Sequence, residues 1–276
     1  MPSFHIGNVP VDYVEQGSGV PVLLLHSSGS SRAQWRALID QLSGDFRVFA
    51  PDLYGYGATG AWPERAPFTL EDEAQIVLAL LERCGEPAHL VGHSYGGAVA
   101  LNVARARGEL VRSLAVIEPV AFHLLREGDH EDEAALAEVA DIAGTVERSL
   151  DRGDYDHGFG RFVDYWSGAG AWTAIAPAKR SAIAAHLPKV ALDFRATIRH
   201  GARSRDFRRL SMPSLVIQGA RSPRPTRRIC ARLAENLPDV RVATVPNGGH
   251  MCPITHREET NDLLAAFLER RPSRAK

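Results

Sequence analysis

The sequence has few cysteines, no long apolar run and no excess of charge of one sign. Its three cysteines, Cys84, Cys230 and Cys252, are an odd number without metal-ligand spacing, so we expect free thiols rather than a disulfide framework. No apolar run approaches the roughly 20 residues that span a bilayer. The first ten residues also lack the basic and apolar regions of a signal peptide. We therefore expect a cytoplasmic protein that does not bind membranes.

The charges are almost balanced, with 32 basic and 33 acidic side chains and a formal net charge of −1. This balance provides no general attraction to nucleic acid or to an anionic surface, so the expected partner is a small-molecule substrate. Homo-oligomer formation is left open. The 276 residues, 45% of them hydrophobic, are enough for one large core with an accessory part.

Strand and helix patterns alternate in the first and last parts of the chain. A helix is expected to begin at Thr69, where acidic residues favour its positive end, and to stop at Gly85. Short apolar runs predict strands at residues 4–6, 11–15, 22–26, 47–50, 88–91, 113–117, 215–217 and 240–245. The alternation predicts the α/β class, with a mostly parallel sheet covered by helices on both faces.

The alternation stops between residues 119 and 210. This stretch has no convincing strand, and its periodicity is helical over residues 134–150 and 155–166. Because strands resume afterwards, we expect a core made of residues 1–118 and 211–276. Residues 119–210 would form an inserted helical cap over the C-terminal edge of the sheet.

The segment Gly92-His93-Ser94-Tyr95-Gly96 matches the pattern G-x-S-x-G. An apolar strand precedes it and a helix rich in alanine and glycine follows it, so Ser94 would lie in a sharp strand-to-helix turn. Glycines at positions 92, 96 and 97 remove the β-carbons that would clash there. The start of the helix also offers backbone N–H groups to a developing oxyanion. Ser94 is therefore the candidate nucleophile.

Together with three further segments, this turn resembles the α/β-hydrolase family over nearly the whole chain. The segments are His26-Ser27-Ser28-Gly29, the stretch Asp52-Leu53-Tyr54-Gly55-Tyr56-Gly57, and Gly248-Gly249-His250. The resemblance implies the α/β-hydrolase fold and a serine hydrolase that needs no metal or organic cofactor. It assigns the general base to His250 and the oxyanion hole to the backbone N–H groups of Ser28 and Tyr95. Ser27 stands where the family usually has glycine.

The carboxylate that should orient His250 is missing from its usual place in this family, the loop after the first strand past the cap. That loop contains Arg221-Ser222-Pro223, and no acidic residue occurs from Leu210 until Glu235. Glu118, at the end of the strand after the nucleophile helix, resembles the acid of haloalkane dehalogenases. We expect it roughly 2.6 to 3.2 Å from Nδ1 of His250. The alternatives are a solvated strand end and a pair with an arginine.

Other residues are expected to act on structure or on the substrate. His26 and His93 would orient loops through hydrogen bonds, and Asp52 would hold its own turn. The arginines at positions 221, 224, 227, 228 and 232 are expected on a solvated helix face. Tyr155, Phe159, Phe162 and Trp166 recur at helical spacing and would share a packing face. The candidate pocket residues, for an apolar acyl or aryl substrate, are Ser27, Phe122, Tyr165, Trp166, Trp172 and Met251.

A serine at the nucleophile position argues against an epoxide hydrolase or a dehalogenase, which attack with a carboxylate. The leading prediction is hydrolysis of a small carboxylic ester, thioester or lactone through an acyl-enzyme intermediate and a Ser-His-Glu triad. C–C bond hydrolases and cofactor-free perhydrolases resemble the same pattern and remain open. So does a ligand-binding homologue without catalysis, because fold alone does not establish function.

Overall fold

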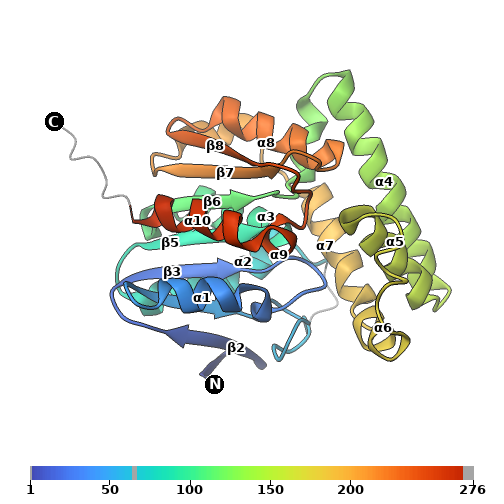
Figure 1. Cartoon of the computed structure of the whole chain (residues 1–276), viewed down its shortest axis with the longest axis horizontal. Coiled ribbons are helices and arrows are strands. Elements are labelled where there is room, and N and C mark those ends of the chain that lie inside the picture. Colours follow the sequence, from blue (N-terminus) through green and yellow to red (C-terminus); the bar gives the residue numbers. More distant parts are fainter. Residues whose placement is uncertain (1, 64–66, 270–276) are drawn as a thin grey trace.

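The computed structural model describes residues 2–63 and 67–269. Its centre is an eight-stranded sheet in the order β1-β2-β4-β3-β5-β6-β7-β8 (Figure 1). The strands are β1 (Ser3–Ile6), β2 (Val9–Gln16), β3 (Val20–Leu25), β4 (Phe46–Pro51), β5 (Ala88–His93), β6 (Val111–Ile117), β7 (Ser214–Gly219) and β8 (Val240–Val245). Each predicted strand is present, most of them a few residues longer than their apolar runs.

Six of the strands, from β4 to β8 along the sheet, run parallel, while β1 and β2 pair antiparallel at one edge. The central strands β3 and β5 are buried along almost their whole length, as expected for strands covered on both faces. The parallel arrangement brings the carboxyl ends of β3, β5, β6, β7 and β8 to one edge, where ligands bind in α/β folds.

Helices cover both faces of this sheet. On one face, α1 (Arg36–Leu42) and α10 (Arg257–Leu268) pack into one hydrophobic cluster with the sheet (Figure 1). On the other face lie α2 (Leu70–Cys84), α3 (Tyr95–Ala106) and α8 (Arg224–Asn236). A Thr69 capping box begins α2 and Gly85, at φ 74°, ends it, as predicted. The α/β class and its layered architecture are thus confirmed.

Between β6 and β7 the chain forms helices only, over the described residues 122–209, which we call the helical insert. It consists of η3 (Phe122–Glu127), α4 (His130–Asp151), α5 (Tyr155–Ser167), α6 (Pro177–Ala184), α7 (Leu187–Arg199) and η4 (Ser204–Arg209). In Figure 1, α4 to α7 gather at one end of the sheet rather than over a face. The insert therefore stands next to the edge where the parallel strands end.

The helical insert is joined to the core by ion pairs that the sequence prediction did not anticipate. Asp132 near the start of α4 is fully buried, and Arg228 Nε on α8 lies 2.5 Å from its carboxylate. Arg232, one turn later, contacts the other oxygen of Asp132. For these two arginines the expected solvated face is wrong, because a buried carboxylate requires charged partners.

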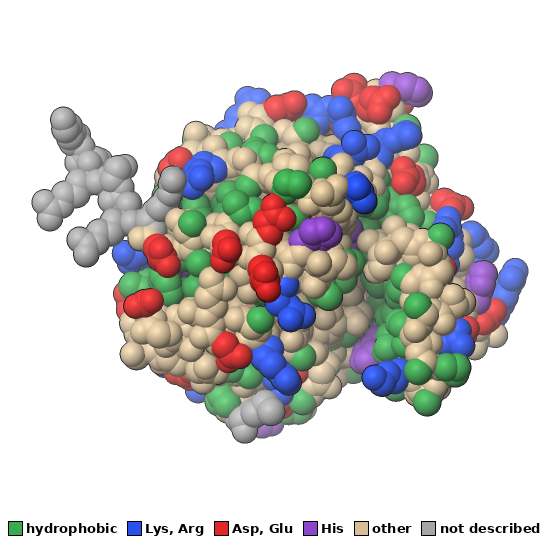
Figure 2. Space-filling model, viewed as in Figure 1, with side chains coloured by type: hydrophobic (Ala, Val, Ile, Leu, Met, Phe, Trp, Pro, Cys, Tyr) green, Lys and Arg blue, Asp and Glu red, His purple; other side chains and the backbone are tan. Residues whose placement is uncertain are grey.

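Two observations describe the surface. In the part of the chain that the structure describes, no helix is long and apolar enough to cross a membrane. Charged side chains of both signs are spread over the visible face, and a hollow separates the core from the helical insert (Figure 2).

Candidate active site

Ser94 lies in the tight turn between β5 and α3, with φ 54° and ψ −115°. These angles are strained for a residue with a side chain, and they project the side chain out of the turn. The turn closes because its neighbours are glycines: a β-carbon on Gly92 would lie 2.3 Å from the carbonyl oxygen of Gly96. A β-carbon on Gly96 would lie 2.4 Å from the carbonyl oxygen of Leu25.

His250 comes from the loop after β8 and meets Ser94 at the edge of the sheet. Its Nε2 lies 2.9 Å from the Ser94 Oγ, and both side chains are more than nine-tenths buried. The imidazole ring also packs against the indole of Trp166 on α5, with ring centroids 4.1 Å apart. The contact with Ser94 is a full hydrogen bond, and it joins residues 156 positions apart in sequence.

Glu118 follows β6 directly and faces the other nitrogen of the same ring. Its Oε2 lies 3.4 Å from His250 Nδ1, slightly beyond the expected range. Its Oε1 accepts hydrogen bonds from the Gly219 N–H at 2.7 Å and the Ser222 hydroxyl at 2.6 Å. These two donors hold the carboxylate from β7 and the loop that follows it, which explains the longer distance to His250.

The electrostatics of Glu118 agree with an ionised carboxylate. Burial alone would raise its pKa, but hydrogen bonds and charge interaction with His250, together with the Ser222 hydroxyl, lower the pKa of Glu118 below its ordinary value. Glu118 also has a left-handed backbone, with φ 49°. Neither alternative for this residue holds, since it is fully buried and its polar partners include His250, Gly219, Ser222 and Thr226.

The two other histidines near the site are held by the backbone, as predicted. His93 Nε2 lies 2.9 Å from the His250 carbonyl oxygen, and its Nδ1 lies 3.0 Å from Gln34 Nε2. The oxygen of the same Gln34 amide accepts from the Ser27 N–H and hydroxyl. Burial lowers the pKa of His93 to about 3, so its imidazole stays neutral. One neutral ring thus links the loop after β3 to the loop of His250.

His26 and Asp52 stabilise turns. His26 Nδ1 lies 2.8 Å from the Ser27 carbonyl oxygen, and its Nε2 accepts from the Leu53 N–H at 3.0 Å. Asp52 accepts from the Ala58 N–H at 2.9 Å, which confirms that it holds its own turn. It also pairs with Arg32.

The two predicted oxyanion-hole residues lie beside Ser94. Tyr95 is the first residue of α3, where a backbone N–H has no preceding helical carbonyl to bond. Ser28 follows β3, the strand next to β5, and lines the same pocket as Ser94 and Tyr95. The strand order therefore brings both backbone segments to the nucleophile.

A narrow pocket lies over Ser94, and its accessible volume of about 10 Å³ holds about one water molecule. Two of the predicted pocket residues line it, Phe122 and Trp166. The others lie outside its wall: Tyr165 donates to Glu138, and Trp172 packs on Phe159. Ser27 is held by Gln34, and Met251 precedes α9 (Cys252–Thr255). The full wall consists of Ser28, Ser94, Tyr95, Val120, Phe122, Phe162, Trp166, Asp193, Phe194 and Thr197.

Sequence reasoning missed α7 as a source of site residues. Its Lys189 and Asp193 are buried and contact each other one turn apart, and Lys189 Nζ also lies 2.8 Å from Glu73 on α2. Burial alone would lower the pKa of Lys189, but the two carboxylates raise it above its ordinary value. The sequence signal for this pair was the presence of two opposite charges, four residues apart, on an otherwise apolar helix face.

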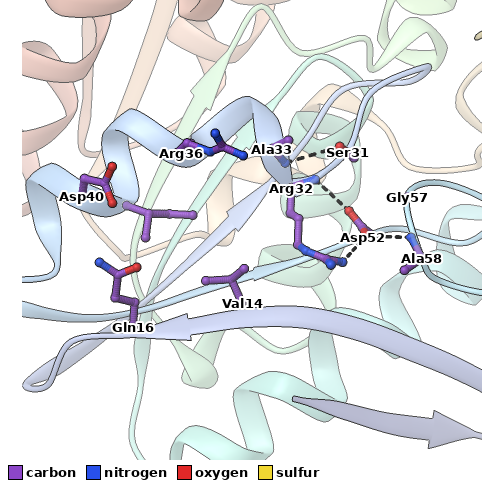
Figure 3. Close-up of a pocket in the computed structure, with 11 residues that line it drawn as sticks. Val14, Gln16, Ser31, Arg32, Ala33, Arg36, Asp40, Asp52, Gly57 and Ala58 are labelled. Carbon is purple, nitrogen blue, oxygen red and sulfur yellow. Dashed lines mark hydrogen bonds and ion pairs between the residues drawn. The ribbon is translucent and has the colours of Figure 1, made fainter. Parts of the chain in front are cut away.

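A wider groove of about 580 Å³ lies elsewhere, beside α1 (Figure 3). Figure 3 shows Arg32 reaching across to Asp52, with Gln16, Arg36 and Asp40 at the other end. None of its lining residues belongs to the Ser94–His250 pair, so the smaller pocket is the candidate active site. Within residues 2–63 and 67–269, no group of three or more His, Cys, Asp or Glu side chains could hold a metal ion.

The family of this chain follows from its similarity to known proteins. Residues 22–263 match the sequence profile of the alpha/beta hydrolase family. The chain belongs to that family. The match includes the strands from most of β3 to β8, the turn of Ser94, the helical insert and the loop of His250. The resemblance that the four motifs suggested is therefore confirmed.

Curated relatives of this alpha/beta hydrolase include hydrolases with different substrates. The (E)-2-((N-methylformamido)methylene)succinate hydrolase of Acinetobacter baylyi is 24% identical over 96% of both chains. The 2-hydroxymuconate semialdehyde hydrolase of Pseudomonas sp. (strain CF600) is 37% identical, but over 37% of this chain and 38% of its own length. The alpha/beta hydrolase MGS-M2, from a Medee basin deep-sea metagenome library, covers all of both chains with a TM-score of 0.83 and 16% identity. The two curated relatives support hydrolase chemistry, and the solved structure supports the fold.

Proposed function

We propose that this alpha/beta hydrolase is a serine hydrolase that cleaves a small carboxylic ester, thioester or lactone through an acyl-enzyme intermediate. The observation that carries the proposal is the 2.9 Å contact between Ser94 Oγ and His250 Nε2, below a pocket with an aromatic wall. A nucleophile and a base within hydrogen-bond reach, with a third group behind the base, are the requirements of this chemistry. Glu118 would be that third group.

The mechanism follows from the positions of these groups. His250 Nε2 takes the proton of Ser94 Oγ as the oxygen attacks the substrate carbonyl, and the carbonyl oxygen becomes an oxyanion. The N–H groups of Ser28 and Tyr95 would donate to it. The imidazolium then gives its proton to the leaving alcohol or thiol. Water, activated by the same ring, attacks the acyl-enzyme and releases the acid and free Ser94.

Glu118 would keep His250 in the required tautomer, with Nδ1–H toward the carboxylate and Nε2 free to accept. The lowered pKa of Glu118 means that it remains ionised when the imidazolium forms and can stabilise that charge. His93 would fix the ring from behind, through its contact with the His250 carbonyl. The helical insert supplies the aromatic part of the pocket and would act as its cap, selecting the acyl or aryl group.

The Ser94–His250 contact favours catalysis over a ligand-binding homologue without activity, because a hydroxyl bonded to an imidazole inside a pocket is the arrangement that acyl transfer needs. Alternative reactions, such as C–C bond hydrolysis and perhydrolysis, would use the same residues. They would differ in substrate rather than in the nucleophile, so the nucleophile is tested first.

Stopped-flow hydrolysis of p-nitrophenyl esters from acetate to decanoate tests the proposal. The wild-type protein should release a burst of p-nitrophenol stoichiometric with enzyme, and Ser94→Ala should lack both the burst and the turnover. Ser31→Ala is a matched control, because Ser31 caps η1 (Arg32–Trp35) outside the site, and it should keep the burst. Equal turnover in the Ser94→Ala variant would remove Ser94 as nucleophile.

A further inference from the structure

The pocket over Ser94 combines four aromatic rings with one buried carboxylate. The rings belong to Phe122, Phe162, Trp166 and Phe194, with centroids of adjacent pairs 5.9 to 6.3 Å apart. The carboxylate is that of Asp193, which is 3% exposed. Aromatic faces carry negative potential and attract cations. Whether this wall attracts a cation or an anion therefore depends on whether the groups around Asp193 donate hydrogen bonds to it or accept them from it.

Every hydroxyl bonded to Asp193 points its proton toward it. Ser28 Oγ lies 2.5 Å and the Tyr56 hydroxyl 2.6 Å from the same carboxylate oxygen, and Lys189 contacts the other. An ammonium can only donate, and burial together with Asp193 raises the pKa of Tyr56 well above its ordinary value, so this phenol keeps its proton. Three donors on one carboxylate define Asp193 as the acceptor.

Tyr95 and Thr197 carry the remaining hydroxyls of the wall apart from Ser94, and both are also committed. The Tyr95 hydroxyl donates to the Glu73 carboxylate at 2.9 Å. Thr197 Oγ1 donates to the backbone carbonyl of Asp193 at 2.7 Å, and a carbonyl can only accept. The protons of Ser28 and Thr197 are thus turned away from the cavity. Outside the catalytic groups, the oxygen atoms of Ser28, Thr197 and Asp193 offer acceptor lone pairs, and the indole N–H of Trp166 is a neutral donor in the same wall.

The positive charge of Lys189 does not turn the wall into a site for anions. Its ammonium lies between Asp193 and Glu73, over the rings of Tyr56, Phe68 and Tyr95, and Lys189 is not part of the pocket wall. The cluster holds two carboxylates against one ammonium. A ligand carboxylate would therefore meet π faces, acceptors and negative charge, with no cationic donor from the wall to balance its own charge.

We propose that the pocket selects acyl groups with a hydrogen-bond donor, most strongly an ammonium group, excludes acyl groups that end in a carboxylate, and owes this preference to Asp193. The inference rests on the proposed hydrolase function and names its substrate class. The ammonium would lie among the four rings and approach Asp193, while the ester carbonyl reaches Ser94.

Three p-nitrophenyl benzoates that differ at the para position test the preference. They carry an aminomethyl (cation), ethyl (neutral) or carboxylate (anion) group. From the para position, across the rigid ring, none of these groups can contact the ester carbonyl of the same molecule. Each kcat/KM is divided by the rate of hydroxide-catalysed hydrolysis of the same ester to remove electronic effects. We expect the cation to exceed the neutral ester by at least about tenfold, and the neutral ester to exceed the anion by a similar factor. Hydrolysis of the anion as fast as the neutral ester would overturn the proposal.

Asp193→Asn should bring the three ratios within about threefold of one another, while the matched control Glu147→Gln leaves them unchanged. Glu147 is a half-exposed carboxylate paired with Arg195 on α7, outside the pocket wall. If Asp193→Asn fails to fold, the double variant Lys189→Gln with Asp193→Asn removes one charge of each sign and keeps polar groups in place. A folded variant of either kind that retains the wild-type ratios would refute the role of Asp193.

Binding separates this proposal from the proposed function. The corresponding benzamides, titrated calorimetrically into the Ser94→Ala variant, should bind in the same order, aminomethyl before ethyl before carboxylate. If the benzamides bind in the expected order but the wild-type protein hydrolyses no ester, the charge preference of the pocket stands and the hydrolase proposal fails. Turnover of neutral esters with the opposite binding order would retain the hydrolase and reject the charge preference.

Discussion

At the scale of single residues, Glu118 carries the most specific prediction. Glu118→Gln keeps the shape of the side chain but removes the charge opposite His250 Nδ1. We expect kcat for p-nitrophenyl ester hydrolysis to fall by a factor on the order of 10³ to 10⁴, because the imidazolium loses its stabilising anion and the tautomer is no longer fixed. Steady-state kinetics at neutral pH measure this change.

The control for Glu118 is Ser222→Ala, which removes one donor to the carboxylate and keeps its charge. It should lower kcat by less than about tenfold, since the Gly219 N–H still holds the same oxygen. A Glu118→Gln variant with more than a tenth of the wild-type rate would mean that another group orients His250.

Residues inside local motifs could be predicted from the sequence, and residues that act through tertiary contacts could not. Ser94 and His250 belong to short patterns with a fixed relation to a strand and a turn, and Glu118 was found because its usual alternative is missing. Asp193 has no such pattern around it. Its role depends on Ser28 and Tyr56, 165 and 137 positions away in sequence, and only the folded chain brings them together.

At the scale of elements, the turn between β5 and α3 depends on how closely it approaches β3. A methyl group on Gly96 would lie 2.4 Å from the Leu25 carbonyl oxygen, a contact that backbone atoms cannot relieve without moving the strand or the helix. We expect Gly96→Ala to lower the thermal unfolding midpoint by several degrees and to abolish ester hydrolysis. Calorimetry and the p-nitrophenyl assay measure the two effects.

Gly44→Ala serves as the control, because a β-carbon there has no atom within 4 Å and its φ is not left-handed. It should keep the wild-type activity and midpoint. If Gly96→Ala were as stable and active as this control, the close approach of the turn to β3 would not be required.

The position of some helices and strands can be predicted from their own residues, whereas the position of others depends on what they contact. Strand β3 is apolar along its length and could be located from its own residues alone, whereas β5 is buried along its length but contains His89 and His93. The aromatic face of α5 was predicted as packing surface, with Trp166 also a candidate pocket residue; Trp166 lines the pocket as predicted, and Phe162 lines it as well. Periodicity identifies the face of a helix that is apolar, but not whether that face meets another helix or a ligand.

At the scale of the whole molecule, buried neutral histidines predict an acid-sensitive fold. Burial lowers the pKa of His26 and His89 to about 4 and that of His93 to about 3. In the unfolded chain each would bind a proton near pH 6.5. The unfolded state therefore binds more protons below that pH, and the free energy of unfolding should fall as the pH drops from 6.5 toward 4.

The expected slope is roughly 1.4 kcal/mol per pH unit for each histidine that is protonated only on unfolding. Glu73 opposes this slope in part. Burial raises the pKa of Glu73, so as the pH falls its carboxylate takes up a proton in the folded state at a higher pH than in the unfolded state. Urea unfolding between pH 7.5 and 5 measures the slope. His89→Gln should reduce it, whereas His157→Gln, at an exposed position of α5, should not. A stability that is constant over this range would contradict the prediction.

The hydrogen bond between Ser222 and Glu118 has a consequence for how the proposed catalytic acid can change place during evolution. Ser222 lies in the loop where the family usually carries the acid, and its hydroxyl is 2.6 Å from Glu118 Oε1. The two positions thus share one space behind His250. A Ser222→Asp substitution followed by loss of Glu118 would move the acid from one strand end to the next, with a carboxylate present at every step and without relocating the histidine.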